Sequence, residues 1–157
     1  MKIAILFLAA CLAFSSCTTI DLYEKVEVIP GHKWNSSFKP AFTFTIKDTA
    51  SPYQLFIILR HNNKYSFNNI WVTLHTKSPD GTIAKAQYEL PLANNEKGWL
   101  GSGMDDLYDH RIALTPPNQN FYFKKGGDYT FTIEHIMRED PLENVMNVGL
   151  RIEKKTR

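Results

Sequence analysis

The stretch Phe42-Thr43-Phe44-Thr45-Ile46 places an apolar side chain at every second position, with threonine between them. Successive side chains of a β-strand point to opposite faces, so this period of two predicts a strand with one buried face. Phenylalanine, isoleucine and threonine also favour extended backbone. The segment therefore indicates a sheet that covers a hydrophobic core on one side.

The same alternation recurs along the chain, and turn-forming residues separate its occurrences. Apolar and polar residues alternate in four further segments, at 70–75, 84–90, 129–134 and 148–153. The tetrapeptide Ser78-Pro79-Asp80-Gly81 joins two of these segments and predicts a β-hairpin. A continuous apolar run at 55–59 is typical of a strand covered on both faces.

Helical patterning is nearly absent from the sequence. We expect at most one short helix, over residues 104–111, where Asp105 and Asp106 would lie near its N-terminus. Short alternating segments separated by turns predict an all-β fold, an antiparallel β-sandwich of about seven to nine strands.

The amino-acid composition is typical of a single globular domain. The chain has 157 residues, of which 43% are hydrophobic and 22% are charged, and this balance excludes intrinsic disorder. Eighteen Lys and Arg against sixteen Asp and Glu give a formal net charge of +2. So small an excess argues against a nucleic-acid-binding surface.

The N-terminus has the layout of a bacterial lipoprotein signal. A cationic start, Met1-Lys2, precedes an apolar run that ends in Ser15-Ser16-Cys17. The run is well short of the ~20 residues that a membrane-spanning helix needs. We therefore predict a signal peptide at residues 1–16 and attachment of lipid, palmitate included, to Cys17. An ordinary cleaved signal with an incidental thiol is the alternative.

Cys11 offers a second position for the same motif. Leu8-Ala9-Ala10 precedes it, but the apolar run before it is too short and the residues after it are still apolar. Residues 17–157 are therefore expected to form a single lipid-anchored β-sandwich domain. Its acyl chains, at ~0.8 kcal/mol per buried CH₂, would hold it on the periplasmic side of the cell envelope. Whether that membrane is the inner or the outer one stays open.

No motif of catalysis or metal binding is present. The sequence lacks HExxH, GxSxG and a phosphate-binding loop, and its five histidines are scattered. We expect a protein that is not an enzyme and has no cofactor or bound metal. His135 is in phase with Phe131 and Ile133, which predicts a buried imidazole satisfied by a neighbouring polar group. A hydrolase that uses His135 or His110 with a nearby aspartate is the alternative.

The segment from Trp99 to Asp109, WLGSGMDDLYD, is the most unusual in the chain. One interpretation is a glycine-kinked crossover with aromatic side chains packed under it. The other is an exposed acidic and aromatic loop that docks a partner protein. The candidate partner-binding residues are Trp99, Gly101, Gly103, Asp106, Tyr108 and, elsewhere in the chain, Trp71.

Trp71 shares the polar face of its predicted strand with Thr73 and His75. A tryptophan on a polar face is either covered by a loop or used for contact. Exposed aromatic side chains on β-sandwiches also stack against sugar rings. A glycan-binding module that uses Trp71 and Trp99 is therefore an alternative function.

Taken together, these segments resemble one family, the gliding-motility lipoprotein H family (GldH-type lipoproteins). The resemblance spans essentially the whole chain and rests on the following stretches: the lipobox ending at Cys17, DLYE at 21–24, Trp34, residues 53–60, Tyr65, Asn69, Trp71, WLGSG at 99–103 with DLY at 106–108, EHIMR at 134–138 and VGLRI at 148–152.

The resemblance implies a cell-envelope lipoprotein needed for surface gliding, whose apparatus is linked to type IX protein secretion. It implies other envelope lipoproteins, or secretion and gliding subunits, as partners, and it brings no enzymatic activity or cofactor. Cys17 is the single functional position that it carries over, as the site of lipid attachment. The contact residues of the Trp99 segment are our own inference.

Overall fold

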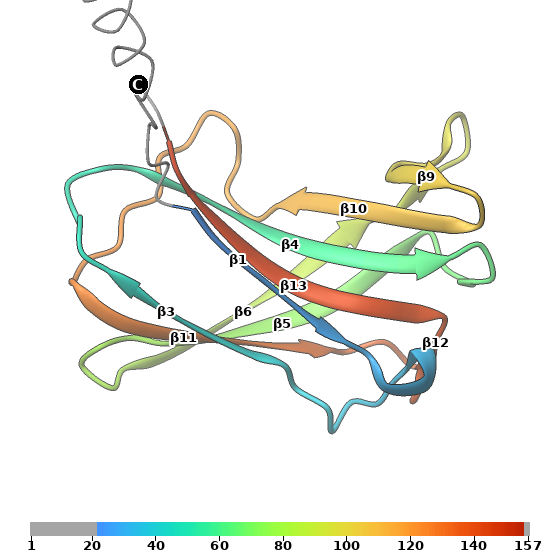
Figure 1. Ribbon diagram of the computed structural model, residues 1–157, viewed down its shortest axis with the longest axis horizontal. Coiled ribbons are helices and arrows are strands. Elements are labelled where there is room, and N and C mark those ends of the chain that lie inside the picture. The colour runs from blue at the N-terminus through green and yellow to red at the C-terminus, as the bar shows by residue number, and fades with distance from the viewer. Residues whose placement is uncertain (1–21, 156–157) are drawn as a thin grey trace, which may run out of the picture.

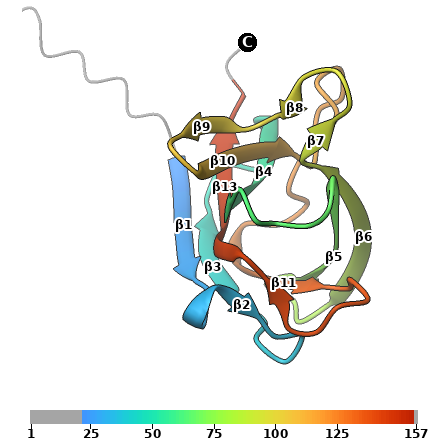
Figure 2. The ribbon, with the colours of Figure 1, turned by 90° about the vertical axis from the view of Figure 1, so that its right-hand side faces the viewer.

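The computed structural model describes residues 22–155 (Figures 1 and 2). The signal peptide predicted for residues 1–16 and the lipidation site Cys17 lie outside the described residues. Within the part that is described, no helix has the length and apolar character needed to cross a membrane.

Two antiparallel sheets face each other across the core (Figure 2). The five-stranded sheet has the order β1 (Leu22–Val28), β13 (Val145–Lys154), β4 (Tyr53–Asn62), β10 (Leu107–Ala113) and β9 (Ser102–Met104). The four-stranded sheet has the order β3 (Ala41–Ile46), β11 (Gly127–His135), β5 (Asn69–Lys77) and β6 (Ile83–Pro91). The predicted all-β, antiparallel sandwich is confirmed.

Short ladders add to these sheets. β2 (Lys33–Trp34) pairs with β12 (Leu142–Glu143), and β7 (Ala93–Asn94) pairs with β8 (Gly98–Trp99). They raise the number of strands in the described residues to thirteen, above the seven to nine expected. Two residues are too few to show an alternation, so the sequence could not indicate these strands. One short 3₁₀ helix, Pro30–His32, is the helical segment of the described chain.

The alternation that predicted a half-buried strand becomes β3. Phe42, Phe44 and Ile46 are buried and the residues between them are exposed. The register with β11 sets Phe42 opposite Phe131, and the rings of Phe44 and Phe131 meet edge to face with centroids 5.2 Å apart. Such aromatic packing adds about 0.5–1.5 kcal/mol per pair to the free energy of burial.

The continuous apolar run becomes the middle of β4, between β13 and β10. Leu55, Ile57 and Leu59 point into the core and are at most 4% exposed. Phe56 points the other way and is half-buried, with the guanidinium of Arg111 4.1 Å above its ring. The outer face of β4 at Phe56 is thus covered by the long charged side chain of Arg111 and not by a second layer of secondary structure, as the continuous apolar run had suggested.

The predicted hairpin at residues 78–81 is confirmed. It joins β5 to β6, and the Ser78 N–H donates to the carbonyl of Thr82 at 2.9 Å. Gly81 has φ +81°, a left-handed conformation that glycine adopts without a steric penalty.

The helix predicted over residues 104–111 is wrong. Met104 ends β9, Leu107 begins β10, and these two residues pair across a tight turn. Asp105 takes φ 56° in that turn, a conformation that Asp tolerates better than most residues. β10 then pairs along its length with β4. Strand pairing therefore outweighs the acidic pair that suggested a helix start.

Candidate functional site

Residues 93–106, which we call the flap, contain β7, β8, β9 and the turn into β10 (Figure 1). Trp99 is half-buried, and its indole lies against His61 and Tyr108 with ring centroids 4.4 and 5.5 Å away. Tyr65 completes the cluster at 6.4 Å from Trp99. The candidate residue Trp99 therefore anchors the flap from within it, and the candidate residue Tyr108 supports it from β10.

Gly101 and Gly103 let the flap approach β10 closely. A Cβ on Gly101 would lie 2.6 Å from the carbonyl oxygen of Asp109 and 2.9 Å from the ring of His110. A Cβ on Gly103 would lie 3.0 Å from the ring of Tyr108. Gly101 fixes the geometry of the flap, because a side chain there would meet the backbone of β10, whereas a side chain at Gly103 would require the Tyr108 ring to shift.

Asp106 ties the flap to the loop after β4. Its carboxylate accepts a 2.7 Å hydrogen bond from the side-chain amide of Asn63, and its backbone carbonyl accepts one of 2.8 Å from the Asn63 N–H. Asp106 is exposed, but its hydrogen bonds give it a positioning role within the protein.

The exposed large apolar side chains of the flap are those of Leu100 and Met104, which we call the rim together with the exposed Asp105. Leu100 is 45% exposed and Met104 is 77% exposed. β9, which carries Met104, has a strand neighbour on one side only among the described residues. An exposed edge strand with an apolar side chain, a second apolar side chain nearby in sequence and an adjacent carboxylate is suited to contact with another protein.

Two histidines under the flap form a pair that the sequence did not suggest. The Nε2 atoms of His61 and His110 are 2.9 Å apart, and Nδ1 of His61 lies 2.8 Å from the carbonyl of Asn62. Burial lowers the pKa of both imidazoles, and burial together with His61 brings the pKa of His110 to about 4. Both rings are thus neutral at pH 7, with one N–H donating to the other ring.

The register of β4 against β10 creates this pair. Tyr108 faces His61, and His110 follows two residues later on the same face. The alternation of each strand predicts an inward side chain at both positions, but a single sequence does not show which strands are neighbours. Among residues 22–155, no group of three or more His, Cys, Asp or Glu is placed to hold a metal ion.

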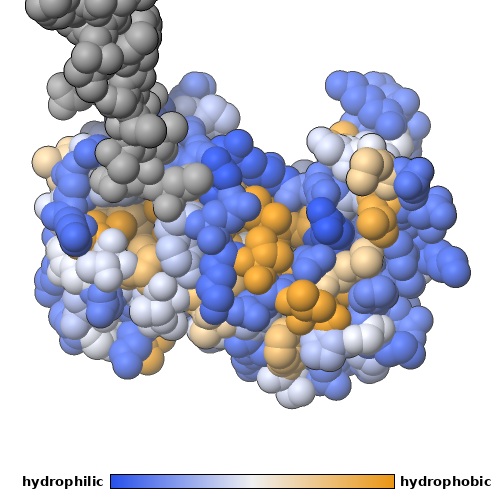
Figure 3. Space-filling view, viewed as in Figure 1, coloured by the Kyte–Doolittle hydropathy of each residue, from blue (hydrophilic) through white to orange (hydrophobic). Residues whose placement is uncertain are grey.

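A hollow of about 530 Å³ lies beside the flap on the outer face of the five-stranded sheet. Figure 3 shows this face, with apolar patches set among hydrophilic side chains. Three arginines line the hollow, and each has a carboxylate partner. Arg60 donates two hydrogen bonds of 2.6 and 2.8 Å to Asp109. Arg111 lies 2.6 Å from Glu153, and Arg151 contacts both Glu24 and Glu153. Because these charges are already paired, the hollow does not point to an anionic ligand.

Trp71 lies on a different surface from Trp99. It is on the outer face of β5, opposite Glu89 of β6, and is 40% exposed. Ile136 is next to it, with its N–H donating to the Trp71 carbonyl at 2.9 Å. The two tryptophans therefore do not form one platform, and the glycan interpretation depends on Trp71 alone.

His135 is buried as expected, at 1% exposure, but neither ring nitrogen has a hydrogen-bond partner. The prediction of a satisfied imidazole is wrong in this respect. Its ring packs against Trp34 at 5.3 Å, and the nearest Asp140 oxygen is 3.8 Å from Nε2. Burial lowers the pKa of His135 and keeps the ring neutral.

Asp140 is not arranged with His135 as in a hydrolase. Both its oxygens accept hydrogen bonds from Ser36, one from the backbone N–H at 2.8 Å and one from the hydroxyl. The Ser36 hydroxyl thus bonds to the carboxylate, whereas a nucleophilic serine must bond to the imidazole. The three residues join two loops and do not form a catalytic triad.

The sequence profile of the GldH lipoproteins matches residues 21–152, which include the flap and all but the last two residues of the two sheets. The chain belongs to the GldH lipoprotein family. Membership in a lipoprotein family implies a lipid-anchored protein of the cell envelope.

Two curated relatives share nearly the full length of the chain. The gliding motility lipoprotein GldH of Flavobacterium johnsoniae is 30% identical over 158 residues, covering 96% of this chain and 95% of the relative. A gliding motility lipoprotein GldH homolog of Christiangramia forsetii is 29% identical over 156 residues, covering 95% and 93%.

Two solved structures share a distant similarity with this GldH family member. The Yersinia pseudotuberculosis-derived mitogen aligns with a TM-score of 0.36 at 8% identity, covering 88% of this chain and 89% of the mitogen. The VP2 subviral particle protein of infectious bursal disease virus aligns at 0.37 and 13% identity, covering 87% of this chain and 33% of VP2.

Proposed function

We propose that this GldH family member is a non-enzymatic scaffold of the gliding and type IX secretion machinery. Acyl chains on Cys17 hold the sandwich on the periplasmic side of its membrane, and the rim docks onto another envelope lipoprotein or a secretion subunit. The family membership carries the proposal, since both curated relatives are named gliding motility lipoproteins.

The construction of the flap supports a docking role for the rim. Two glycines, the Trp99 cluster and the Asn63–Asp106 hydrogen bonds hold the flap firmly against the sheet. Leu100 and Met104 are consequently presented in a fixed geometry, which lowers the entropic cost of binding a partner. Membrane anchoring raises the local concentration near other envelope proteins, so a small contact suffices.

Deletion of the gene, followed by complementation, tests the proposal. We expect the deletion strain to lose surface spreading or type IX secretion, and the full-length gene to restore them. A complementing gene with Leu100→Ser and Met104→Ser should restore neither, although its product is folded and present in normal amounts. Unchanged spreading and secretion in the deletion strain would show that the proposal is wrong.

The exposure of Trp71 supports a second candidate, a glycan-binding module. It predicts that the full-length protein binds envelope polysaccharide or peptidoglycan, and that Trp71→Ala abolishes this binding while Trp99→Ala acts only through stability. No binding across a broad glycan panel would exclude it.

A further inference from the structure

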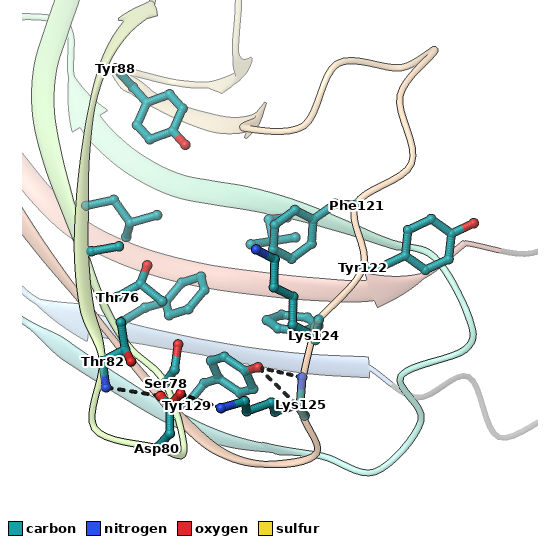
Figure 4. Close-up of a pocket in the computed structure, with 15 residues that line it drawn as sticks. Thr76, Ser78, Asp80, Thr82, Tyr88, Phe121, Tyr122, Lys124, Lys125 and Tyr129 are labelled. Atoms are coloured by element: carbon teal, nitrogen blue, oxygen red, sulfur yellow. Dashed lines mark hydrogen bonds and ion pairs between the residues drawn. The ribbon is translucent and has the colours of Figure 1, made fainter.

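A groove of about 570 Å³ opens between β6 and the segment at residues 116–125 (Figure 4). Its walls are mostly aromatic and aliphatic, and they include Leu55 of β4 together with Leu74 and Phe131 of the opposite sheet. These three residues are at most 5% exposed, so the groove enters the space between the two sheets. A second hollow of about 210 Å³ shares Leu55, Leu74, Tyr88 and Phe121 and continues it.

The inward face of β6 is apolar in sequence, yet part of it is uncovered. Ala84, Ala86 and Tyr88 share this face with Leu90, and only Leu90 is buried. Ala84 and Ala86 are exposed and Tyr88 is half-buried. Among the described residues, the segment at 116–125 lies opposite this face and leaves the groove open between them.

Three hydroxyl side chains and an ion pair gather at one end of the groove. Thr76, Ser78 and Thr82 lie there, together with the ion pair of Lys125 and Asp80 at 2.6 Å (Figure 4). That pair keeps the pKa of Asp80 at about 2, so its charge is neutralised by Lys125. This end therefore offers hydroxyl groups but no free negative charge.

Of the two lysines that line the groove among residues 22–155, Lys125 is paired with Asp80 and Lys124 is the other. Figure 4 shows its side chain extending along the groove toward Phe121, while Tyr122 points away. Among residues 22–155, no carboxylate is paired with Lys124. An unneutralised ammonium group beside apolar walls matches a ligand with one negative charge and a hydrocarbon body.

We propose that this groove binds an anionic amphiphile, with its hydrocarbon chain between Tyr88 and Phe121 and its carboxylate or phosphate headgroup on Lys124. The location favours a chain, because the groove reaches buried residues of both sheets, Leu55, Leu74 and Phe131, which a folded protein surface cannot contact. Its volume lies in the range of about 300–1,000 Å³ that is typical of small-molecule sites. This site is separate from the rim and does not depend on the proposed scaffold function.

A photoactivatable palmitic acid analogue with a diazirine and an alkyne tests the site. The full-length protein in phospholipid nanodiscs is irradiated with the probe, and labelled peptides are identified by mass spectrometry. We expect label on residues 74–88 and 116–131 in excess of all other segments. Ala84→Trp, which fills the mouth of the groove at an exposed position, should remove that excess without unfolding the protein.

Charge reversal separates specific binding from partitioning into lipid. Lys124→Glu should weaken labelling of the groove by about tenfold, the effect of one lost ion pair of moderate strength. Lys85→Glu is the matched control, since it makes the same charge change on the outer face of β6, and it should leave labelling unchanged. An uncharged analogue, the corresponding alcohol, should be insensitive to Lys124→Glu.

Two results would overturn the proposal. They are label spread evenly over the exposed segments, or equal losses of labelling in the Lys124 and Lys85 variants. Circular dichroism of each variant ensures that a loss of labelling comes from the site and not from unfolding.

Discussion

Nε2 of His61 lies 2.9 Å from Nε2 of His110, in a buried layer beneath Trp99 and the flap. Two imidazoles at this distance form one hydrogen bond only while at least one of them is neutral. Their environment ensures this, because burial lowers the pKa of both. The pair therefore links the stability of the flap to pH.

Acidification should destabilise the protein between pH 6.5 and about 4. The unfolded chain binds a proton at His110 below its ordinary pKa of 6.5, whereas the folded protein does so only near pH 4. The stability is thus fully present above pH 6.5 and falls as the pH drops. A shift of this size corresponds to about 3 kcal/mol. Urea unfolding of the full-length protein at pH 7 and pH 4.5 measures it.

His110→Gln isolates the contribution of His110 from those of His61 and His135, whose pKa values are lowered as well. Glutamine retains a hydrogen-bond donor but does not titrate, so the variant should lose less stability between pH 7 and 4.5 than the wild type. Equal losses in both proteins would mean that the buried pair does not control the pH dependence.

Gly101→Ala should destabilise the fold by about 1–3 kcal/mol, the usual cost of overpacking. The new methyl group would lie 2.6 Å from a backbone oxygen of Asp109, and backbone cannot rotate away as a side chain can. The thermal midpoint of unfolding measures the effect. Ser102→Ala, at an exposed neighbouring position, is the control and should stay within about 0.5 kcal/mol. Equal midpoints would contradict the close packing of the flap.

Phe42→Ala should cost about 3–5 kcal/mol, because Phe42 is 0% exposed and fills the layer between the sheets. Thr43→Ala, one residue away on the solvent face, loses a hydroxyl contact of 3.0 Å with Thr130 and should cost less than about 1 kcal/mol. Denaturant midpoints of the two variants test the register of β3. Similar losses of stability in the two variants would contradict the assignment of Phe42 to the buried face of β3 and Thr43 to the exposed face.

Trp99→Ala and the rim variants should affect different properties. Removal of the half-buried indole from its contacts with His61 and Tyr108 should lower stability by about 2 kcal/mol. Leu100→Ser and Met104→Ser remove only exposed side chains and should change stability by less than about 0.5 kcal/mol. Thermal unfolding of each variant makes the comparison, and a large loss at Met104 would show that the rim belongs to the core.

The alternation of apolar residues was sufficient to predict the sandwich, because side-chain direction in a strand follows from sequence position alone. The prediction of a helix at Asp105 and Asp106 was wrong, because an acidic pair occurs both at the start of a helix and in a tight turn. Only the pairing of Met104 with Leu107 decides between them.

The site was harder to predict, because its contacts join residues far apart in sequence. His61 and His110, and likewise Ser36 and Asp140, meet through strand register and loop packing. Trp99 and Tyr108 were singled out as aromatic residues in a polar segment, which does not show whether they face a partner or the core. The groove at Lys124 is a gap between two sheets, and no local pattern in the sequence records it.

The most direct test of the scaffold account is a cross-linked pull-down of the full-length lipoprotein from intact cell envelopes, analysed by mass spectrometry. The wild type is compared with the Leu100→Ser, Met104→Ser double variant. A second double variant, Val28→Ser and Ile83→Ser, is the control, because it removes two other exposed apolar side chains away from the flap. We predict that the wild type and the control enrich gliding or type IX secretion components, and that the rim variant does not. Equal enrichment of these components by all three proteins, or enrichment of glycan without any protein partner, would contradict the account.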